Sequence, residues 1–344
     1  MFLMLSCPAR TAPLAFYGFT PLFNSMIMIN ENEKLESPFF KFDADTWSTF
    51  RHEMAPLSLT EEELEHCVAF NDQLSLNEVN RIYLPLSRLL YLYYNSRLDR
   101  IQVLHKFLGQ SYDDIPFIIS ISGPVSVGKT TTAKILTELI RAWPNHPKAT
   151  LITTDGFLYP NAVLKEKKIL SRKGFPISYD VKALMQFLKD VKNGVPHVKV
   201  PVYSHLTYDV VEGEFTDVDR PNVLIIEGVN VLQNGSDYPE IRNRAFISDY
   251  IDFSIYVDAN EDNLLKWYID RFLKLREKTF HDPTSYFHRY AQIPEDQAVF
   301  MAKLIWEAVN HVNLIENIKP CRSRANLVLE KGSNHMIESV YLKK

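Results

Sequence analysis

The 344-residue chain is long enough for one large α/β domain or two small ones, and its 46% hydrophobic and 23% charged residues are typical of a soluble protein with a substantial core. A formal net charge of −4, without a basic block that carries interleaved aromatics, argues against nucleic acid as a partner. The three cysteines, Cys7, Cys67 and Cys321, form no metal-ligand spacing and indicate a reducing, cytoplasmic setting.

The chain begins with an apolar segment that does not fit a secretory signal. It lacks a basic n-region, and Pro8, Pro13 and Pro21 interrupt its apolar runs. We expect residues 1–36 to be an extension outside the folded domain, either disordered or the result of a start codon assigned too early. No run of about 18 apolar residues occurs, so we expect no membrane span.

Residues 37–114 are predicted to form a helical layer. Thr60 with Glu63, and Ser75 with Glu78, have the spacing of capping boxes ahead of periodic apolar runs. Pro85 is expected to kink or restart the second of these helices. An apolar face recurs along it at helical spacing, made of Val79, Ile82, Tyr83, Leu86, Leu89, Leu90 and Tyr93.

From residue 115 the pattern changes to alternating strands and helices. Near-continuous apolar runs such as 223–226 are typical of a parallel sheet covered on both faces. We therefore predict a single domain over residues 37–344, whose part 115–344 is a doubly wound, mostly parallel α/β core with ligands at the carboxyl ends of its strands. The predicted strands are 117–122, 149–154, 198–203, 222–227, 251–258 and 325–330, and the predicted helices are 131–143, 180–192, 261–278 and 295–316, with Pro294 in the first turn of the last.

A phosphate loop follows the first predicted strand of this core. GPVSVGKTT (123–131) fits the pattern G-x-x-x-x-G-K-[ST] and leads into a predicted helix. Glycines let backbone N–H groups point at phosphate oxygens, and the helix adds its positive N-terminal end. We expect Lys129 to reach the outer phosphates of a nucleotide and the Thr130 hydroxyl to bind Mg²⁺. The predicted nucleotide-binding residues are Gly123, Pro124, Val125, Ser126, Val127, Gly128, Lys129, Thr130 and Thr131.

Three classes of phosphate-loop protein differ in what else the sequence must contain. A GTPase switch requires an N-K-x-D base-reading motif, which is absent from the sequence. A motor or transporter ATPase requires a strand that ends in Asp–Glu, whereas the strand here ends Ile226-Glu227-Gly228. A small-molecule kinase requires a metal, charge neutralisation and a carboxylate near the acceptor hydroxyl, and this class is favoured.

Two acidic residues at strand ends are the candidate carboxylates. Asp155 follows the predicted strand 149–154, on the side where the phosphate loop opens. It can take the acceptor's proton or hold Mg²⁺ through water, although Asp-Gly is also a common turn dipeptide. Glu227 ends its strand in the manner of a Walker B acid, so we expect it to orient Mg²⁺ or its water. A simple end-of-strand cap is the alternative for Glu227.

Two further segments offer polar and cationic groups. VPVYSHLTYD (200–209) puts Tyr203 and His205 on one side of a strand, where they can hydrogen-bond an acceptor or serve the structure alone. The helical run 264–280 offers Arg271 and Arg276 to charge on a transferring phosphoryl group, although a solvated arginine is the ordinary reading of either. The aromatics that follow, within a lid-like segment 264–293, either close over a substrate or fill the core; they are Phe280, Tyr286, Phe287 and Tyr290.

Taken together, these motifs resemble those of the bacterial type I pantothenate kinases. The resemblance runs in consistent order from about Ser37 to Lys344. Its motifs are GPVSVGKTTT, ITTDGFLYPN, RKGFP, PVYSHLTYD, LIIEGVNVLQ, YIDFSIYVDA, WYIDRFLKLRE, DPTSYFHRYA and LEKGSNH. The phosphate loop alone is shared with uridine kinases and phosphoribulokinases of the same superfamily.

The resemblance implies ATP-dependent phosphorylation of the 4′-hydroxyl of pantothenate, the first step toward coenzyme A. It implies a cytoplasmic homodimer that coenzyme A inhibits in competition with ATP. It also implies that Asp155 is the base and that Lys129 and Arg271 stabilise the transferred phosphoryl group. Only the resemblance assigns the remaining residues: pantothenate contacts at Tyr203, Tyr268, Asn310, Phe280 and Phe287, contacts to coenzyme A or substrate at Lys173 and His205, and an adenine site at Asn71, Lys331 and His335.

The sequence departs from the family's pattern at three positions. Thr130 replaces a common serine, and either hydroxyl can bind Mg²⁺. Lys134 replaces an arginine tied to coenzyme A inhibition, which keeps the charge but loses the two-pronged donor geometry. Leu275 replaces an aromatic residue near the distal end of the substrate.

Two alternatives stay open. One is a kinase of the same superfamily for another alcohol such as uridine, which substrate preference would distinguish. The other is a regulator that binds ATP or coenzyme A without turnover, against which the intact set of Lys129, Asp155 and Arg271 argues.

Overall fold

The computed structural model describes residues 37–51, 59–68, 74–110, 115–233 and 246–344. The chain divides into two units, Met1–Pro38 and Phe39–Lys344. Only Ser37 and Pro38 of the first unit are described, so the extension expected at 1–36 lies outside the described residues. The fold below is that of the second unit.

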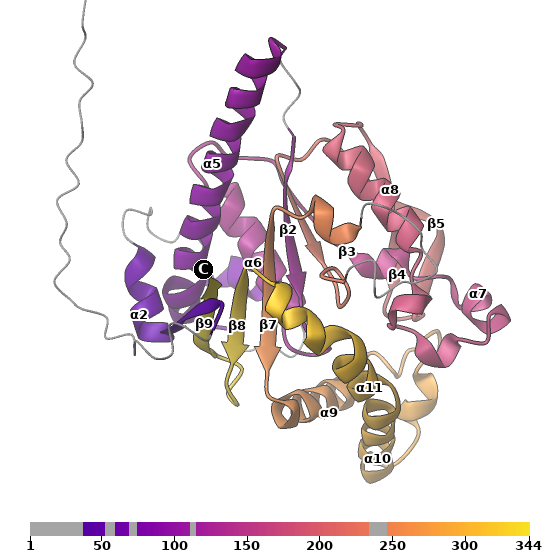
Figure 1. Cartoon of the computed structure of the whole chain (residues 1–344). Coiled ribbons are helices and arrows are strands. Elements are labelled where there is room, and N and C mark those ends of the chain that lie inside the picture. Colours follow the sequence, from indigo (N-terminus) through magenta and orange to yellow (C-terminus); the bar gives the residue numbers. More distant parts are fainter. Residues whose placement is uncertain (1–36, 52–58, 69–73, 111–114, 234–245) are drawn as a thin grey trace, which may run out of the picture. The chain divides into compact units, whose positions relative to one another are not determined.

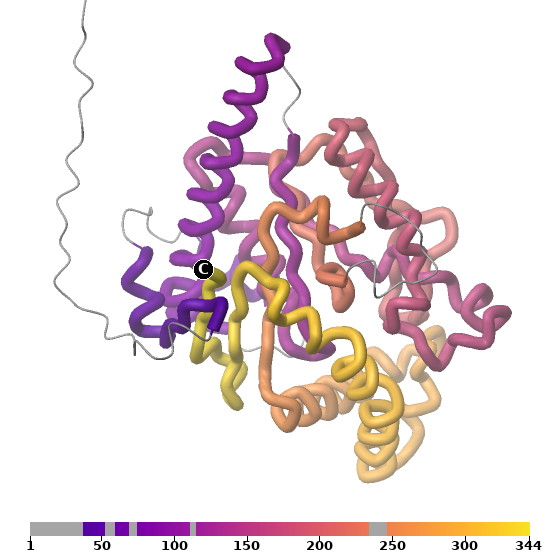
Figure 2. The backbone as a smooth tube through the Cα atoms, in the orientation of Figure 1, coloured from indigo at the N-terminus to yellow at the C-terminus, as the bar shows by residue number. Residues whose placement is uncertain are grey.

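A seven-stranded sheet with the order β1-β9-β8-β7-β2-β6-β3 forms the centre of the second unit (Figure 1). The strands β8, β7, β2, β6 and β3 run parallel, whereas β9 and β1 add antiparallel pairs at one edge. In Figure 2 the indigo β1 and the yellow β9 lie side by side although they come from opposite ends of this unit. The bounds are β1 Phe39–Asp43, β2 Phe117–Ser122, β3 Ala149–Thr153, β6 Val223–Glu227, β7 Phe253–Ala259, β8 Leu327–Lys331 and β9 Ile337–Lys343.

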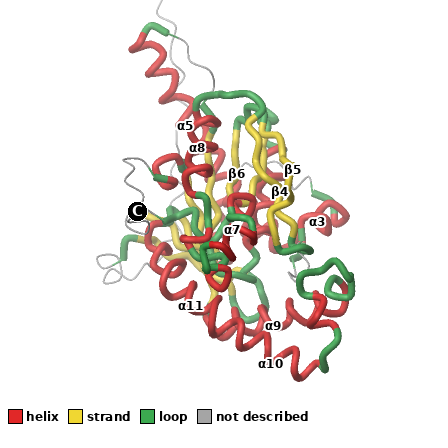
Figure 3. The backbone as a smooth tube through the Cα atoms, turned by 90° about the vertical axis from the view of Figure 1, so that its right-hand side faces the viewer, coloured by secondary structure: helices red, strands yellow, loops and turns green. Residues whose placement is uncertain are grey.

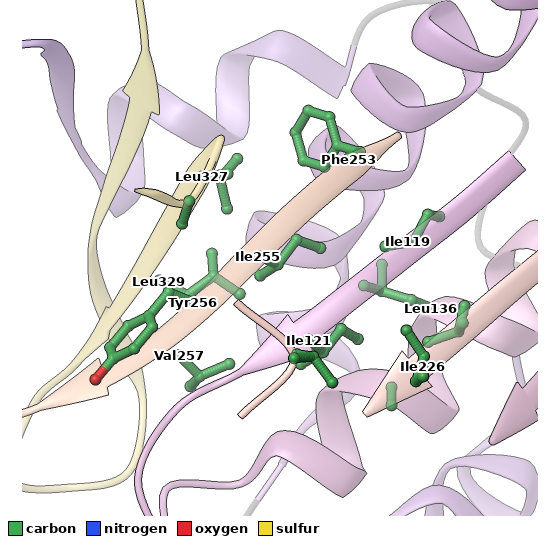
Figure 4. Packing of buried hydrophobic residues seen from close by; sticks show 14 of the residues in the cluster. Ile119, Ile121, Leu136, Ile226, Phe253, Ile255, Tyr256, Val257, Leu327 and Leu329 are labelled. Carbon is green, nitrogen blue, oxygen red and sulfur yellow. The ribbon is translucent and has the colours of Figure 1, made fainter. Parts of the chain in front are cut away.

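The middle of this sheet is buried on both faces. Every residue of β2 and of β6 is buried, as their uninterrupted runs FIISIS and VLIIE require. Ile119 of β2 pairs with Phe253 of β7, and Ile121 pairs with Ile255. Figure 4 shows these apolar side chains together with Ile226 of β6 and Leu136 of α6, the helix that follows β2. The central strands are therefore fixed by apolar burial, and their polar chemistry is confined to their ends.

Helices cover the sheet and gather at one end of it. α6 contacts β2, β3 and β6, and α5 contacts α6. Figures 1 and 3 show α9, α10 and α11 together at one end of the unit. The bounds are α2 Ala44–Ser48, α3 Glu61–Cys67, α4 Leu76–Glu78, α5 Leu84–Leu108, α6 Lys129–Arg141, α7 Asn161–Glu166, α8 Val181–Lys192, α9 Glu261–Lys278, α10 Glu295–Ile305 and α11 His311–Asn313, with π turns at Val79–Tyr83, Trp306–Asn310 and Leu314–Ile318.

The predicted doubly wound core is confirmed, and the differences lie at its margins. Residues 39–43, predicted within a helical layer, form the edge strand β1 because they pair with β9, which is distant in sequence. The predicted strand 198–203 exists as β4 (Val198–Ser204), but it pairs with β5 (Asp209–Val218) in a separate antiparallel sheet (Figure 3). The strands β5 and β9 escaped prediction because neither is a continuous apolar run; most of β5 is exposed.

The helix signals were mostly right. Thr60 and Glu63 form the predicted capping box. Ser75 caps α4 as predicted, but the Glu78 carboxylate instead accepts a 2.9 Å hydrogen bond from the Ile337 N–H and so ties α4 to β9. α5 begins at Leu84 directly after a π turn, so Pro85 restarts the helix.

At the C-terminal side, Pro294 is the residue before α10 rather than part of its first turn. The predicted helix 295–316 is divided by π turns into α10 and α11. Within the described ranges, no helix is both long and apolar enough to cross a membrane.

Candidate active site

The phosphate loop joins the carboxyl end of β2 to the N-terminus of α6, as predicted. Gly123 has a φ of +146°, and a Cβ there would lie 2.2 Å from the carbonyl oxygen of Val257 on the adjacent strand β7. Gly128 precedes α6 with a φ of +95°. Both positions require glycine, and the loop they allow opens at the positive end of a 13-residue helix.

The loop contains groups that suit an anion. The Ser126 hydroxyl is buried and has no hydrogen-bond partner among the described residues, which leaves it available to a phosphate oxygen. The Nζ of Lys129 donates a 2.7 Å hydrogen bond to the carbonyl oxygen of Pro124, so this lysine lies over its own loop. An ammonium group has three N–H donors, so Lys129 can keep this bond while it contacts a phosphate.

Glu227 lies beside this loop because β6 pairs with β2. Its Oε2 accepts a 3.0 Å hydrogen bond from the Thr130 hydroxyl. Burial raises the pKa of the Glu227 carboxyl, and the charge of Lys129 opposes that shift. Thr130 is exposed whereas Glu227 is buried, so one of the two oxygens comes from a solvent-exposed residue and the other from a buried residue. Such an oxygen pair fits a hard cation such as Mg²⁺.

Asp155 lies at the same edge of the sheet, in the 3₁₀ turn Thr154–Phe157 that follows β3. Because β3 pairs with β6, the carboxyl ends of β2, β6 and β3 stand in a row. A Cβ at Gly156 would lie 2.1 Å from the carbonyl oxygen of Pro201. The glycine therefore lets β4 pack directly on this turn, which brings the segment 200–209 to Asp155.

Three rings of that segment lie close to Asp155. The rings of Tyr203 and His205 contact each other at a centroid distance of 5.2 Å, although β4 ends at Ser204 and His205 lies in the turn that follows. Tyr208 lies 6.3 Å from Tyr203. Burial raises the pKa of both tyrosines, and the negative charge of Asp155 adds to each shift. Burial lowers the pKa of His205, which Asp155 opposes. All three rings are therefore neutral hydrogen-bonding groups at neutral pH.

Lys173 is a buried cation beside these rings, with 6% of its surface exposed. Its Nζ donates hydrogen bonds to Oδ1 of Asn161 (2.7 Å) and to the carbonyl oxygen of Tyr208 (2.5 Å), and it lies 4.2 Å from the Tyr208 ring centroid. Burial lowers the pKa of Lys173 to about 8, against the opposing charges of Asp209 and Asp155. A positive charge thus stands within electrostatic range of Asp155.

Tyr268 and Arg271 come from α9, the helix that follows β7. Tyr268 shares a side-chain hydrogen bond with Asn310, and burial raises the pKa of Tyr268 to about 12. Asn310 ends the π turn Trp306–Asn310, a helical irregularity that is frequent at functional sites. The charge of Arg271 acts on both His205 and Glu227, so this arginine lies between the β4 segment and the acid beside the phosphate loop.

The aromatics after α9 fill a small core, which is one of the two alternatives that the sequence left open. Phe280 is buried and packs on Phe272 and Tyr290 in a small core of its own. Phe287 is half-buried and lies between Phe280, at 5.2 Å, and Tyr208, at 5.0 Å. The lid-like segment is therefore a small packed unit, and Phe287 at its edge contacts Tyr208.

Some predicted residues lie apart from this group. Arg276 donates to the carbonyl oxygens of Tyr290 (3.1 Å) and Ile293 (2.6 Å), so it braces the lid-like segment. Leu275 packs in the same small core. Lys134 is one helical turn beyond Thr130, on a cavity of about 690 Å³ between α3 and α6. Lys331 and His335 lie at the end of β8 and in the turn after it, and Asn71 lies outside the described residues.

One group at the site has no signal in the sequence. Asn161 accepts from Lys173, its Nδ2 donates to the carbonyl oxygen of Tyr208 (2.9 Å), and its N–H donates to Asp209 (2.9 Å). It therefore holds the buried lysine and the β4–β5 turn together. An asparagine after a proline reads as an ordinary helix start, so only its tertiary contacts identify it.

Comparison with known proteins agrees with this geometry. Residues 118–292 match the model of the phosphoribulokinase/uridine kinase family. The pantothenate kinase of Cronobacter sakazakii is 52% identical over 317 residues, which are 92% of this chain and 100% of that protein. That of Vibrio cholerae is 52% identical over 312 residues, 91% and 99% of the two chains.

A solved structure, the D-glycerate 3-kinase of Cryptococcus neoformans, has a TM-score of 0.50 at 13% identity, covers 73% of this chain and 97% of its own, and supports the fold alone. The phosphate loop, the acids at neighbouring strand ends and these full-length matches together establish that the chain belongs to the pantothenate kinase family of P-loop kinases.

Proposed function

We propose that the chain transfers the γ-phosphoryl group of ATP to the 4′-hydroxyl of pantothenate, with Mg²⁺, as the first step of coenzyme A biosynthesis. The observation that carries the proposal is the row formed by the phosphate loop, Glu227 and Asp155 at the carboxyl ends of β2, β6 and β3. This row supplies phosphate binding, a metal ligand and an acceptor carboxylate in one line, as phosphoryl transfer requires. Membership of the pantothenate kinase family supports the choice of acceptor.

The phosphate loop binds the nucleotide in this proposal. Backbone N–H groups of residues 123–131, the Ser126 hydroxyl and Lys129 hold the phosphate oxygens. Thr130 and Glu227 would hold Mg²⁺, directly or through its waters, and the ion would neutralise charge on the outer phosphates. The adenine lies toward Lys331 and His335, with Asn71 as a further contact.

Asp155 receives the acceptor. Its carboxylate accepts a hydrogen bond from the 4′-hydroxyl and orients the oxygen for attack on the γ-phosphorus. As the new O–P bond forms, the bond from the γ-phosphorus to the β–γ bridging oxygen breaks, ADP leaves, and Asp155 takes the hydroxyl proton. Lys129 and Arg271 stabilise the charge on the oxygens of the transferring group. No covalent intermediate with the protein is needed.

The other side chains near Asp155 are assigned to an elongated, amide-containing acid. Tyr203, His205 and the pair Tyr268–Asn310 offer neutral donors and acceptors to hydroxyl, amide and carboxylate groups. Phe280 and Phe287 provide apolar walls for the methylene and methyl carbons.

The deciding experiment measures ADP release from Mg·ATP with pantothenate, with uridine and without an acceptor. Release with pantothenate alone is expected. Release with uridine alone would keep the fold and the phosphate chemistry but overturn the assignment of Tyr203, Tyr268 and Asn310. Tight binding of ATP without formation of ADP in any of the three mixtures would instead identify a nucleotide-binding regulator.

Inhibition by coenzyme A also belongs to the proposal. Coenzyme A competes with ATP in this proposal. Its contacts are assigned to Lys134, Lys173 and His205. Lys134 keeps a charge where relatives use arginine, so Lys134→Arg should strengthen inhibition. An unchanged inhibition constant for coenzyme A in this variant would remove Lys134 from the site.

We further propose a cytoplasmic homodimer. The end of α5 carries an apolar stripe at helical spacing whose members are strongly exposed: Val103 (64%), Leu104 (48%), Phe107 (84%) and Leu108 (48%). A second copy of the chain can bury this stripe. Light scattering should give a dimer for the native chain and a monomer for Phe107→Glu. Phe300→Glu, at an exposed position of α10, is the control that should stay dimeric. Retention of the dimer by Phe107→Glu would exclude α5 as the interface.

A further inference from the structure

Trp267 is a buried residue of α9 that the proposed chemistry leaves without a role. It is 2% exposed, next to Tyr268 and one helical turn before Arg271. Its Nε1–H has no hydrogen-bond partner among the described residues. A buried indole without a polar partner is unusual, because tryptophan N–H groups in protein interiors are normally paired. Its position is therefore set by the contacts of its ring.

The principal ring contact is with His335. The two rings are stacked, with centroids 4.0 Å apart and an interplanar angle of 26°. His335 comes from the turn between β8 and β9, 68 positions later in the sequence. The contact therefore joins α9 to the β8–β9 turn, two elements that are distant in the chain.

The backbone of His335 is itself held in an uncommon conformation. Its φ is +65°, in the left-handed region that a non-glycine residue enters at a free-energy disadvantage. The turn is closed by hydrogen bonds from Gly332 N–H to the Met336 carbonyl (2.9 Å) and from His335 N–H to the Gly332 carbonyl (3.2 Å). A Cβ at Gly332 would lie 1.7 Å from Oε1 of Glu338. The turn is thus built tightly, and it presents the imidazole to the indole face.

We propose that Trp267 is a positioning residue for the nucleotide base: its indole face fixes the imidazole of His335, so that the base site on the β8–β9 turn and the phosphoryl-facing Arg271 on α9 form one rigid unit. The proposal rests on the proposed function, which assigns His335 to the adenine site. It adds that Trp267 determines affinity and selectivity for the base without touching the nucleotide phosphates. An unpositioned histidine would retain its chemistry but lose orientation.

The test compares Trp267→Leu, which keeps a large apolar side chain but no ring face, with Trp267→Phe, which keeps a face. Calorimetry measures the affinity for Mg·ADP and, separately, for inorganic tripolyphosphate, which carries no base. Loss of one aromatic stacking contact should weaken ADP binding by about 2- to 12-fold in the leucine variant, with partial rescue by phenylalanine. Tripolyphosphate affinity and the KM for pantothenate should stay unchanged, and the preference for ATP over GTP should narrow.

A double-mutant cycle with His335→Ala separates positioning from general packing. If Trp267 acts through His335, then Trp267→Leu has no further effect on ADP affinity once His335 is alanine. An equal loss of ADP and tripolyphosphate affinity, or an undiminished effect in the His335→Ala background, would overturn the proposal. Failure of the native chain to bind Mg·ADP at all would instead refute the proposed function, so the two failures are distinguishable.

Discussion

The hydroxyl of Thr130 and the carboxylate of Glu227 are joined by a 3.0 Å hydrogen bond that links the first turn of α6 to the end of β6. One partner is exposed and the other is buried. The bond fixes two oxygen atoms at the mouth of the phosphate loop before any ligand arrives. This preorganisation is the basis of the first prediction.

Thr130→Val removes one oxygen and the donor that holds the other. We expect the free Mg²⁺ concentration for half-maximal activity to rise by about 10- to 100-fold, as is usual when a metal ligand or its support is lost. Thr130→Ser, which keeps the hydroxyl, should behave like the native chain. The measurement is the initial rate against free Mg²⁺ at saturating ATP, and equal midpoints for the valine and serine variants would contradict the metal assignment.

Asp155→Asn keeps the size of the side chain at the end of β3 but removes its charge. We expect kcat for pantothenate to fall by about 10²- to 10⁴-fold, which is the usual contribution of a general base, while the affinity for Mg·ADP stays within about twofold. Rapid-mixing kinetics with calorimetry on the same preparation measures both. Full turnover in this variant would leave Asp155 with no more than a structural role in its turn.

Lys173 sets a basic limit to the activity. Its pKa of about 8 makes it charged at pH 7 and neutral above pH 9. Because its charge acts on Asp155, kcat/KM for pantothenate should fall as pH rises through about 8. Lys173→Arg, whose side chain stays protonated, should lose this basic limb. A profile that is level from pH 7 to 9.5 in the native chain would contradict the prediction.

The same group gives stability a definite pH dependence. The pKa of Lys173 is near 10.5 in the unfolded chain and about 8 in the folded chain, so the unfolded state binds more protons between these values. Burial of the charged lysine therefore destabilises the fold below pH 8, and this effect is relieved as pH rises toward 10.5. Over this range the contribution of Lys173 to the free energy of unfolding changes by about 3 kcal/mol. Urea unfolding at pH 7 and pH 9.5 should show a stability gain in the native chain that Lys173→Met lacks; equal changes in both chains would disprove it.

Gly123→Ala tests the shape of the phosphate loop. The added Cβ would meet the Val257 carbonyl oxygen at 2.2 Å in a backbone conformation that alanine avoids. We expect a loss of about 2 kcal/mol or more in the free energy of unfolding, with weaker Mg·ADP binding.

Gly109→Ala is the matched control, because Gly109 has a φ of +65° but no atom within 4 Å of the added Cβ. It should lose about 1 kcal/mol and keep its nucleotide affinity. Identical behaviour of the two variants would assign the effect to backbone strain alone.

Several site features could be predicted because they are local. The phosphate loop is a contiguous motif between a strand and a helix, and Asp155 and Glu227 each follow an apolar run that had to be a strand. Parallel strands put their carboxyl ends on one edge, so these three pieces could be placed together without coordinates. The period-two spacing predicted that Tyr203 and His205 lie on one side of their strand; the two rings do contact each other, although the strand ends at Ser204, before His205.

Other features depend on partners that the local sequence does not name. Residues 39–43 form a strand because they pair with the edge of β9. β4 lies outside the main sheet because it pairs with β5. Asn161 gained its role from Lys173 and Tyr208, and Trp267 from His335. None of these contacts has a periodicity or motif of its own.

The sequence by itself determined the order of strands and helices in the core, the phosphate loop, and the acids at the strand ends, because apolar periodicity and glycine placement act within a few residues of the chain. Only the tertiary structure decided which residues surround Asp155, how deeply Lys173 is buried, and that the ring of Trp267 meets that of His335. Burial and side-chain orientation arise from contacts between segments far apart in sequence, and so the charge state of a lysine or the fixing of a histidine appears only once those segments have packed.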